Sequence, residues 1–428
     1  MKYSTSVTGM GIVCSIRKNV REFTNSLREG ICGIGTMEYL KDAPVGVKLG
    51  AEIKRDNFEK FLEEYYGPGK AEAEIISRAR QAARRAPLPV QWTVAAAMEA
   101  WDQAKLSGID AERIGIVVAG SNLSQNLQYS LNPGFLENPE YISPNYALNY
   151  LDTNYVGTLS EIFGIHGEGF SVGGASSSGN VGIIKAFQLL QLGILDVCMV
   201  VGAPAVLSPM EIQSFCNIGA MGGKFYANKP QEACRPFDME HEGFIYGQGA
   251  ACIIMESSEF AKNRDALIYA EILGGAIVLD GNRLSNPSEE GEVRAMTNAL
   301  SQAGVKAEQI NYINAHGTAS PIGDETEVNA VKRVFSENLK DIRVNSTKGL
   351  TGHCLYSAGV VEAVAAIIQM NEGFLHPNLN LVNPIDMQIR FCGPEKSRAD
   401  ILYSMSNSFG FGGFNTSIVL RRGETSYG

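Results

Sequence analysis

Short runs of apolar, β-branched residues alternate along the chain with longer segments in which apolar residues recur at helical spacing. The short runs predict strands at 5–14, 114–120, 168–174, 196–203, 249–256, 267–279, 310–315, 342–347, 403–407 and 415–421. The helical spacing predicts helices at 92–105, 177–191, 257–263, 289–304, 324–336 and 357–371. Strands that alternate with helices are typical of an α/β fold with a mostly parallel sheet.

Two segments share one pattern, in which a strand leads through a turn of glycine and serine into an apolar helix. They are FSVGGASSSGNVGIIKAFQLLQLG at 170–193 and VNSTKGLTGHCLYSAGVVEAVAAIIQMNEG at 344–373. The second helix has almost no polar face, which predicts that it is buried. One such helix in each half predicts two stacked α/β halves, 1–257 and 258–428, with helices sandwiched between sheets.

The composition fits one compact body that works in the cytoplasm. The chain is 45% hydrophobic and 19% charged, which is enough for a large core. Its net charge of -10 argues against nucleic-acid binding by the chain as a whole. The eight cysteines are scattered without a metal-binding cluster, as expected in a reducing cytosol. We expect no secretory signal and no membrane span, because the longest apolar runs are too short.

Three glycine-rich motifs resemble nucleotide-binding loops, but each lacks a residue that phosphate binding requires. TGMGIVC has Cys14, and FGFGGFN has Asn415, where the dinucleotide fingerprint needs glycine. MGGKF has no serine or threonine after Lys224. We therefore expect no nucleotide site at these motifs.

Two of the five histidines stand at equivalent places in the two repeats. His316 ends an apolar strand in NAHGTASPIGDETE, and His353 lies between a strand and the buried helix in STKGLTGHCLYSAG. Neighbouring glycines allow a substrate to approach the backbone closely, and strand ends meet at one point in such folds, where ligands bind. The sequence leaves open the alternative that both are ordinary histidines satisfied by hydrogen bonds.

Three segments of the chain resemble the signatures of β-ketoacyl-acyl carrier protein synthases, the condensing enzymes of fatty-acid and polyketide assembly. They are AHGTASPIGDETE, STKGLTGH…AG…E and NSFGFGGFN. The similarity covers nearly the whole chain, with 140 residues from Ser176 to His316 and 37 more to His353. The resemblance implies the thiolase fold, a duplicated five-layered α/β body that is usually a homodimer. It also implies a substrate carried on the phosphopantetheine arm of an acyl carrier protein, and no permanently bound cofactor or metal.

The resemblance further implies roles for individual residues. His316 and His353 match two catalytic histidines, and Lys348 and Glu362 match the lysine and carboxylate beside them. A carboxylate in so apolar a helix has to be paired or neutral, which agrees with Lys348 as its partner. Phe411 matches a gating phenylalanine whose backbone N–H helps to form an oxyanion hole. Positions that match the substrate-binding set are Thr318, Ser320, Phe215 and Gly412.

Ser176 departs from the family pattern, which has a cysteine after the alanine of this turn. A cysteine ionises easily, because its pKa of about 8.5 falls further at a helix N-terminus. A serine needs a general base to take its proton. We therefore expect acyl transfer to be crippled and malonyl decarboxylation to survive, as in the Cys-to-Ser homologues of polyketide β-branching cassettes.

Two other functions stay open. One is full condensation through an acylated Ser176, and the other is a non-catalytic partner subunit that resembles chain-length factors.

Basic residues predict where a carrier protein docks. SRARQAARR at 77–85 supplies four arginines, and a lysine adds a further candidate: Arg78, Arg80, Arg84, Arg85 and Lys224. The alternative is a solvated helix face. A separate polar group stands where the family places small apolar residues near the acyl pocket, and it either fills the acyl tunnel or decorates an exposed loop: Asn122, Gln125, Asn126 and Gln128.

Overall fold

Ten strands run through the molecule as one continuous sheet in the computed structural model, which describes residues 4–54, 58–65 and 73–424. The first half contributes β1 (Thr5–Cys14), β4 (Ile114–Ala119), β5 (Gly169–Val172), β6 (Val197–Gly202) and β7 (Gly249–Ser257). The second half contributes β8 (Ala270–Leu279), β9 (Tyr312–Asn314), β10 (Arg343–Asn345), β13 (Tyr403–Gly410) and β14 (Phe414–Arg422). Each of these strands overlaps one that the sequence predicts.

The two halves of the sheet repeat one topology. In the order β5-β4-β6-β7-β1 only β7 runs antiparallel to the other strands, and in the order β10-β9-β13-β14-β8 only β14 does so. A short antiparallel pairing of Thr5–Val7 with Ala270–Ile272 joins them. The duplication predicted from the sequence is therefore confirmed, while the boundary after residue 257 stays a prediction.

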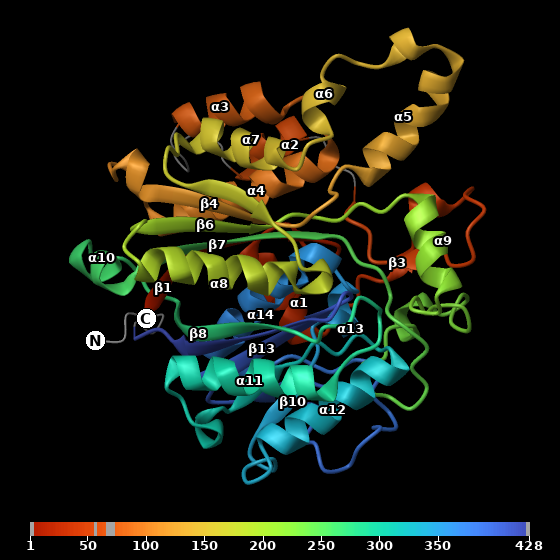
Figure 1. Cartoon of the computed structure of the whole chain (residues 1–428), viewed down its shortest axis with the longest axis vertical. Coiled ribbons are helices and arrows are strands. Elements are labelled where there is room, and N and C mark those ends of the chain that lie inside the picture. The colour runs from red at the N-terminus through yellow and green to blue at the C-terminus, as the bar shows by residue number, and fades with distance from the viewer. Residues whose placement is uncertain (1–3, 55–57, 66–72, 425–428) are drawn as a thin grey trace.

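Helices and sheet halves stack in five layers (Figure 1). One outer layer contains α3 (Ala73–Ala83), α4 (Leu88–Ala104) and α7 (Thr153–Phe163), and the other contains α11 (Glu289–Ala303) and α12 (Pro321–Val334). The middle layer holds α8 (Ser178–Gln191) and α14 (Ala358–Glu372). The remaining helices are α1 (Val20–Glu29), α2 (Phe58–Tyr65), α5 (Gln125–Glu137), α6 (Tyr146–Asn149), α9 (Pro209–Asn217), α10 (Ser258–Asn263) and α13 (Lys348–Thr351).

The two middle helices touch at glycines, and this contact sets the position of the site. A Cβ atom added to Gly179 would lie 2.8 Å from the Cα of Gly359, so only glycine allows α8 and α14 to come this close. One turn before each helix, Ala175 and Leu355 have positive φ angles of 48° and 52°. The two turns that present Ser176 and His353 therefore face each other across the centre of the molecule.

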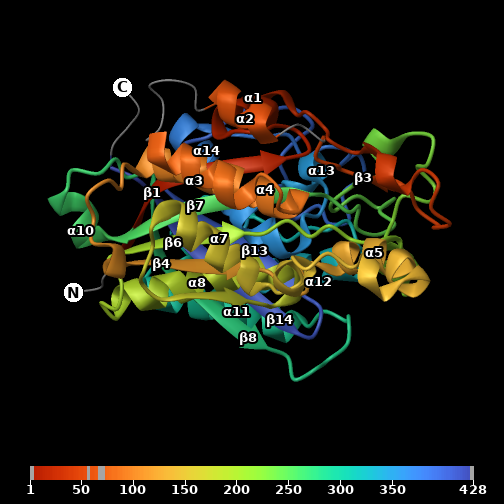
Figure 2. The same ribbon diagram turned by 90° about the horizontal axis from the view of Figure 1, so that it is seen from above.

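The polar residues expected near an acyl pocket lie elsewhere. Asn122 and Gln128 are exposed, and α5 and α6 form an arm that extends away from the layers (Figure 1 and Figure 2). Asn126 lines a separate cavity of about 170 Å³ with Leu123 and Tyr155. None of the four polar residues lines the cavity that contains Ser176 in the described chain, so the predicted tunnel filling is not observed.

We expected neither a membrane-spanning helix nor a metal site from the sequence, and the described residues can be searched for both. Among them, no helix combines the length and the apolar character that crossing a membrane requires. The same residues contain no group of three or more histidine, cysteine, aspartate or glutamate side chains placed to hold a metal ion.

Candidate active site

A cavity of about 320 Å³ lies where the turns before α8 and α14 meet. It gathers residues from segments that are far apart in the sequence, because both repeats deliver their strand ends to this point. Seven of the predicted site residues line it: Ser176, Phe215, His316, Thr318, Ser320, His353 and Phe411. Lys348 and Glu362 lie behind the wall, where each is at most 2% exposed.

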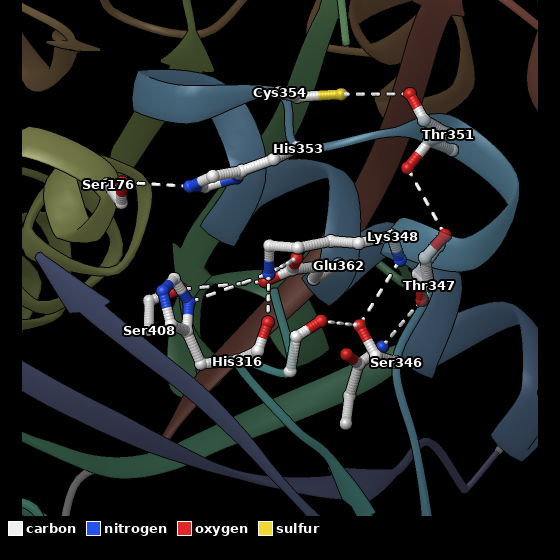
Figure 3. A network of polar contacts seen from close by, with 12 residues as sticks. Ser176, His316, Ser346, Thr347, Lys348, Thr351, His353, Cys354, Glu362 and Ser408 are labelled. Atoms are coloured by element: carbon white, nitrogen blue, oxygen red, sulfur yellow. Dashed lines mark hydrogen bonds and ion pairs between the residues drawn. The ribbon is translucent and has the colours of Figure 1, made fainter. Parts of the chain in front are cut away.

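Ser176 sits on a tight turn between β5 and α8. Ala175 holds a left-handed backbone conformation, which lifts the next side chain out of the chain path. A Cβ at Gly410 would meet the Gly174 carbonyl oxygen at 2.5 Å, so β13 packs directly against this turn. The Ser176 Oγ atom lies 2.8 Å from Nε2 of His353 (Figure 3).

The hydrogen bonds of His353 assign its tautomer. Its Nδ1 atom accepts a hydrogen bond from the Leu355 backbone N–H at 3.3 Å, so Nδ1 carries no proton. The ring proton of the neutral imidazole is therefore on Nε2, which donates to Ser176. Burial, and after it the charge of Lys348, hold the pKa of His353 well below its usual value. His353 thus presents an N–H donor to the cavity, and it has no free lone pair to take the proton of Ser176.

His316 is held in the same tautomer by a different partner. The Lys348 Nζ atom donates to His316 Nδ1 at 3.5 Å and to the His316 carbonyl oxygen at 2.6 Å. The proton of the ring is therefore on Nε2, which is not used by this contact. Burial, followed by the charge of Lys348, lowers the pKa of His316 far below its usual value. The two imidazole rings lie 5.5 Å apart, nearly at right angles.

Lys348 and Glu362 form a buried ion pair behind the histidines (Figure 3). Lys348 begins α13 and Glu362 lies on α14, and their side chains are 1% and 2% exposed. The third donor of the Lys348 ammonium is directed to Glu362, so its three hydrogen bonds are all used. Burial raises the pKa of Glu362 although Lys348 opposes this shift. The sequence correctly predicted this partnership.

A further carboxylate, which the sequence analysis did not single out, positions His316. Glu327 on α12 accepts hydrogen bonds from the backbone N–H groups of His316 and Gly317, each at 2.8 Å. Burial raises its pKa to about 7 despite these donors. One turn earlier, Asp324 accepts from the backbone of Ala319 at 3.1 Å. The sequence contained a pattern that could have identified these acids. In GDETE at 323–327, Asp324 and Glu327 are three residues apart, which places both carboxylates on one face of a helix.

The remaining predicted substrate-binding residues surround the mouth of the cavity. Thr318 Oγ1 donates to Ser320 Oγ at 3.1 Å, and both residues contribute to the cavity lining. Phe411 is 40% exposed, and its ring lies 6.4 Å from that of Phe215. Gly412 is not among the residues that line the cavity; it lies in the loop after β13, where its N–H donates to the Leu284 carbonyl oxygen at 3.1 Å.

The predicted docking residues fall into two places. On α3, in an outer layer, Arg78 pairs with Glu74 and Arg80 pairs with Glu59 at 2.8 Å. Arg84 and Arg85 are exposed in the turn that follows this helix. Lys224 is exposed and follows the cavity-lining residues 219–220 along the chain. Of the five docking candidates, Lys224 is the one that follows cavity-lining residues closely in the sequence. The docking role of all five residues stays a prediction.

Family models match both parts of the chain. The model described as "Beta-ketoacyl synthase, N-terminal domain" matches residues 4–261, and that described as "Beta-ketoacyl synthase, C-terminal domain" matches residues 269–382.

Individual proteins are similar over almost the full length. The polyketide biosynthesis malonyl-ACP decarboxylase PksF of Bacillus subtilis is 36% identical over 418 residues, which cover 98% of this chain and 96% of that protein. The 3-oxoacyl-[acyl-carrier-protein] synthase 2 of Staphylococcus aureus is 31% identical, with 98% of each chain covered. A solved type II polyketide ketosynthase in complex with its acyl-carrier protein has a TM-score of 0.84 at 25% identity, and the match covers 99% of this chain and 100% of that one.

Proposed function

The chain belongs to the beta-ketoacyl synthase family, and from this premise we propose that it decarboxylates the malonyl group of malonyl-acyl carrier protein to an acetyl group. One observation carries the proposal. The cavity presents two histidines whose N–H groups are fixed as donors, and the turn before α8, where the family resemblance leads us to expect a nucleophilic cysteine, carries Ser176. The similarity to the malonyl-ACP decarboxylase of Bacillus subtilis supports this function.

The two Nε2–H groups supply the stabilisation that decarboxylation needs. When the bond between the α-carbon and the carboxylate breaks, carbon dioxide leaves, and the electron pair moves into an enolate whose negative charge lies on the thioester oxygen. Donors that are already oriented toward this oxygen lower the barrier, and each is worth roughly 2.7–4 kcal/mol. Lys348 and the Leu355 backbone N–H fix the tautomers of His316 and His353, so both rings carry their proton on Nε2 before the reaction begins. The enolate then takes up one proton at the α-carbon.

The same geometry argues against an acyl-enzyme. A serine becomes a nucleophile only when a base takes its proton, and the nearest imidazole donates to Ser176 instead of accepting. Condensation, the runner-up function, requires this base. A non-catalytic partner subunit, the third candidate, would have no need for two oriented histidines and the buried ion pair behind them.

The partner of this reaction is an acyl carrier protein, whose phosphopantetheine arm would enter past Thr318, Ser320 and Phe411. The solved ketosynthase complex with its acyl-carrier protein supports this partner. We further propose a homodimer that pairs through β5, because this strand lies at the open edge of the sheet. The eight unpaired cysteines support a cytoplasmic location. The protein would need no permanently bound cofactor.

Incubation of the purified protein with malonyl-carrier protein alone tests this function. Mass spectrometry of the carrier should show the loss of carbon dioxide from the arm and the formation of one acetyl group for each carbon dioxide released. Carrier that remained malonylated at micromolar enzyme over hours would show that the protein is not a decarboxylase.

Replacing Ser176 with alanine separates decarboxylation from acyl transfer. We expect S176A to keep its rate within about fivefold, because it loses one neutral hydrogen bond of about 1 kcal/mol and no nucleophile. In the wild-type protein incubated with acyl-carrier protein, intact-mass analysis should find no acyl adduct on Ser176. An adduct that accumulates at the rate of turnover would favour condensation.

A further inference from the structure

Glu292 is a carboxyl group in the wall of the same cavity, and neither the sequence motifs nor the two histidines account for it. It lies in the first turn of α11, is 1% exposed, and contributes to the lining together with Ser176 and His316. Its Oε2 atom is buried and has no hydrogen-bond partner among the described residues. An unpartnered polar atom in a buried place is costly, so a functional reason for keeping it is worth seeking.

The surroundings of Glu292 favour the protonated form of its carboxyl group. Burial raises its pKa well above the usual value, and the next causes are the negative charges of Glu327, Asp280, Glu289 and Asp324. These acids come from every side: α12, the loop after β8, and α11 itself. No basic residue is among these causes, and the amide of Asn415, which also lines the cavity, donates to Asp280 at 2.7 Å. Burial and these neighbouring charges therefore both favour the protonated, neutral form of the Glu292 carboxyl group.

Decarboxylation without condensation needs a donor of this kind. In condensation the enolate carbon forms a bond to an acyl group, whereas here it has to receive a proton. The two Nε2–H groups are directed to the thioester oxygen in the proposed function, and Lys348 lies outside the cavity lining with all its donors used. Among the carboxyl groups that line the cavity, Asp280 is held as an acceptor by Asn415, which leaves Glu292 free to donate.

We propose that Glu292 is the general acid that protonates the α-carbon of the enolate and so releases the acetyl group. This inference rests on the proposed decarboxylase function. The proton passes from the Glu292 carboxyl group to the carbon, either directly or through one water molecule, and the resulting carboxylate regains a proton from water that enters through the cavity mouth. Its acidic neighbours favour rapid reprotonation, because they disfavour a second negative charge beside Glu327.

Glu292→Gln is the direct test, because the amide keeps the shape of the side chain but cannot act as an acid at this pH. We expect kcat for acetyl-carrier protein formation to fall by about 10²-fold or more with little change in KM. A first turnover of carbon dioxide, one per enzyme, should remain, because the C–C bond breaks before the proton is needed. The wild-type rate should also fall as alkaline pH ionises Glu292, and this limb of the pH profile should be missing in E292Q.

Two further variants complete the design. E290Q changes an exposed acid in the same helical turn, one that pairs with Arg333, and it should retain wild-type kinetics. E292D keeps the carboxyl group and should recover part of the lost rate, which also gives a measurement if E292Q folds poorly. Wild-type kcat in E292Q, or the loss of the carbon dioxide burst together with kcat, would overturn the role of Glu292. If the wild-type protein itself formed no acetyl product, the proposed function would fail instead.

Discussion

Replacing His353 with alanine is expected to lower the rate of carbon dioxide release from malonyl-carrier protein by about 10²–10³-fold. The variant removes an N–H donor whose direction is fixed by the Leu355 backbone. The His316 variant should show a loss of similar size. The measurement is the steady-state release of labelled carbon dioxide, with binding of the malonyl-carrier protein determined in parallel.

The control for this prediction is H166A, which changes an exposed histidine remote from the cavity and should be fully active. The pH dependence gives an independent check on the tautomers. Because burial keeps the pKa of His353 and of His316 well below 6.5, both rings stay neutral from about pH 6 to pH 8. The wild-type rate should show no imidazole step in this range. Decarboxylation that survived the loss of either ring would contradict the proposed mechanism.

Replacing Lys348 with methionine is expected to reduce the free energy of unfolding by about 3–5 kcal/mol. The variant leaves Glu362 buried in α14 without its cation, and the backbone around it cannot move because α14 is packed on all sides. Protonation of Glu362 at lower pH should recover part of this loss, because its pKa is already raised by burial. Urea unfolding at pH 8 and at pH 6 measures both effects.

The double variant K348M/E362Q separates stability from catalysis. It removes both charges, so most of the lost stability should return. The activity should not return, because His316 Nδ1 has then lost the donor that keeps the ring proton on Nε2. A double variant that remained as unstable as K348M would show that the ion pair is not the cause. A double variant with wild-type activity would show that Lys348 has no role in orienting His316.

The strands and the buried helices could be predicted from the sequence because their signal is local. Every strand of the ten-stranded sheet overlaps a predicted one, since strands that are buried on both faces read as apolar runs whichever way they pair. The helix α5 was missed because its apolar side chains, such as Leu136 at 73% exposed, do not face a core and give no amphipathic pattern. The helix α1 was missed although Asn19 caps its start and Gly30 ends it.

The residues of the candidate site could be predicted where they lie in sequence motifs that resemble those of the family. His316, His353, Lys348 and Glu362 were identified in this way, and the structure places them together. Glu327 and Glu292 were not identified, because their roles depend on backbone atoms and on a cavity that exist only in the folded chain. The tautomers likewise follow from the Leu355 N–H and Lys348 Nζ, whose positions no sequence pattern specifies.

The most direct measurement is a single reaction that contains the wild-type protein, malonyl-carrier protein and an acyl-carrier protein that a condensing enzyme would accept. Because the cavity has two oriented imidazoles and no thiol at Ser176, we expect acetyl-carrier protein and carbon dioxide in equal amounts. The acyl-carrier protein should remain intact. The S176C variant, run beside it, shows whether the same cavity can still condense when a thiol is present. A 3-oxoacyl product from the wild-type protein, longer than the acyl group by two carbons, would contradict the account.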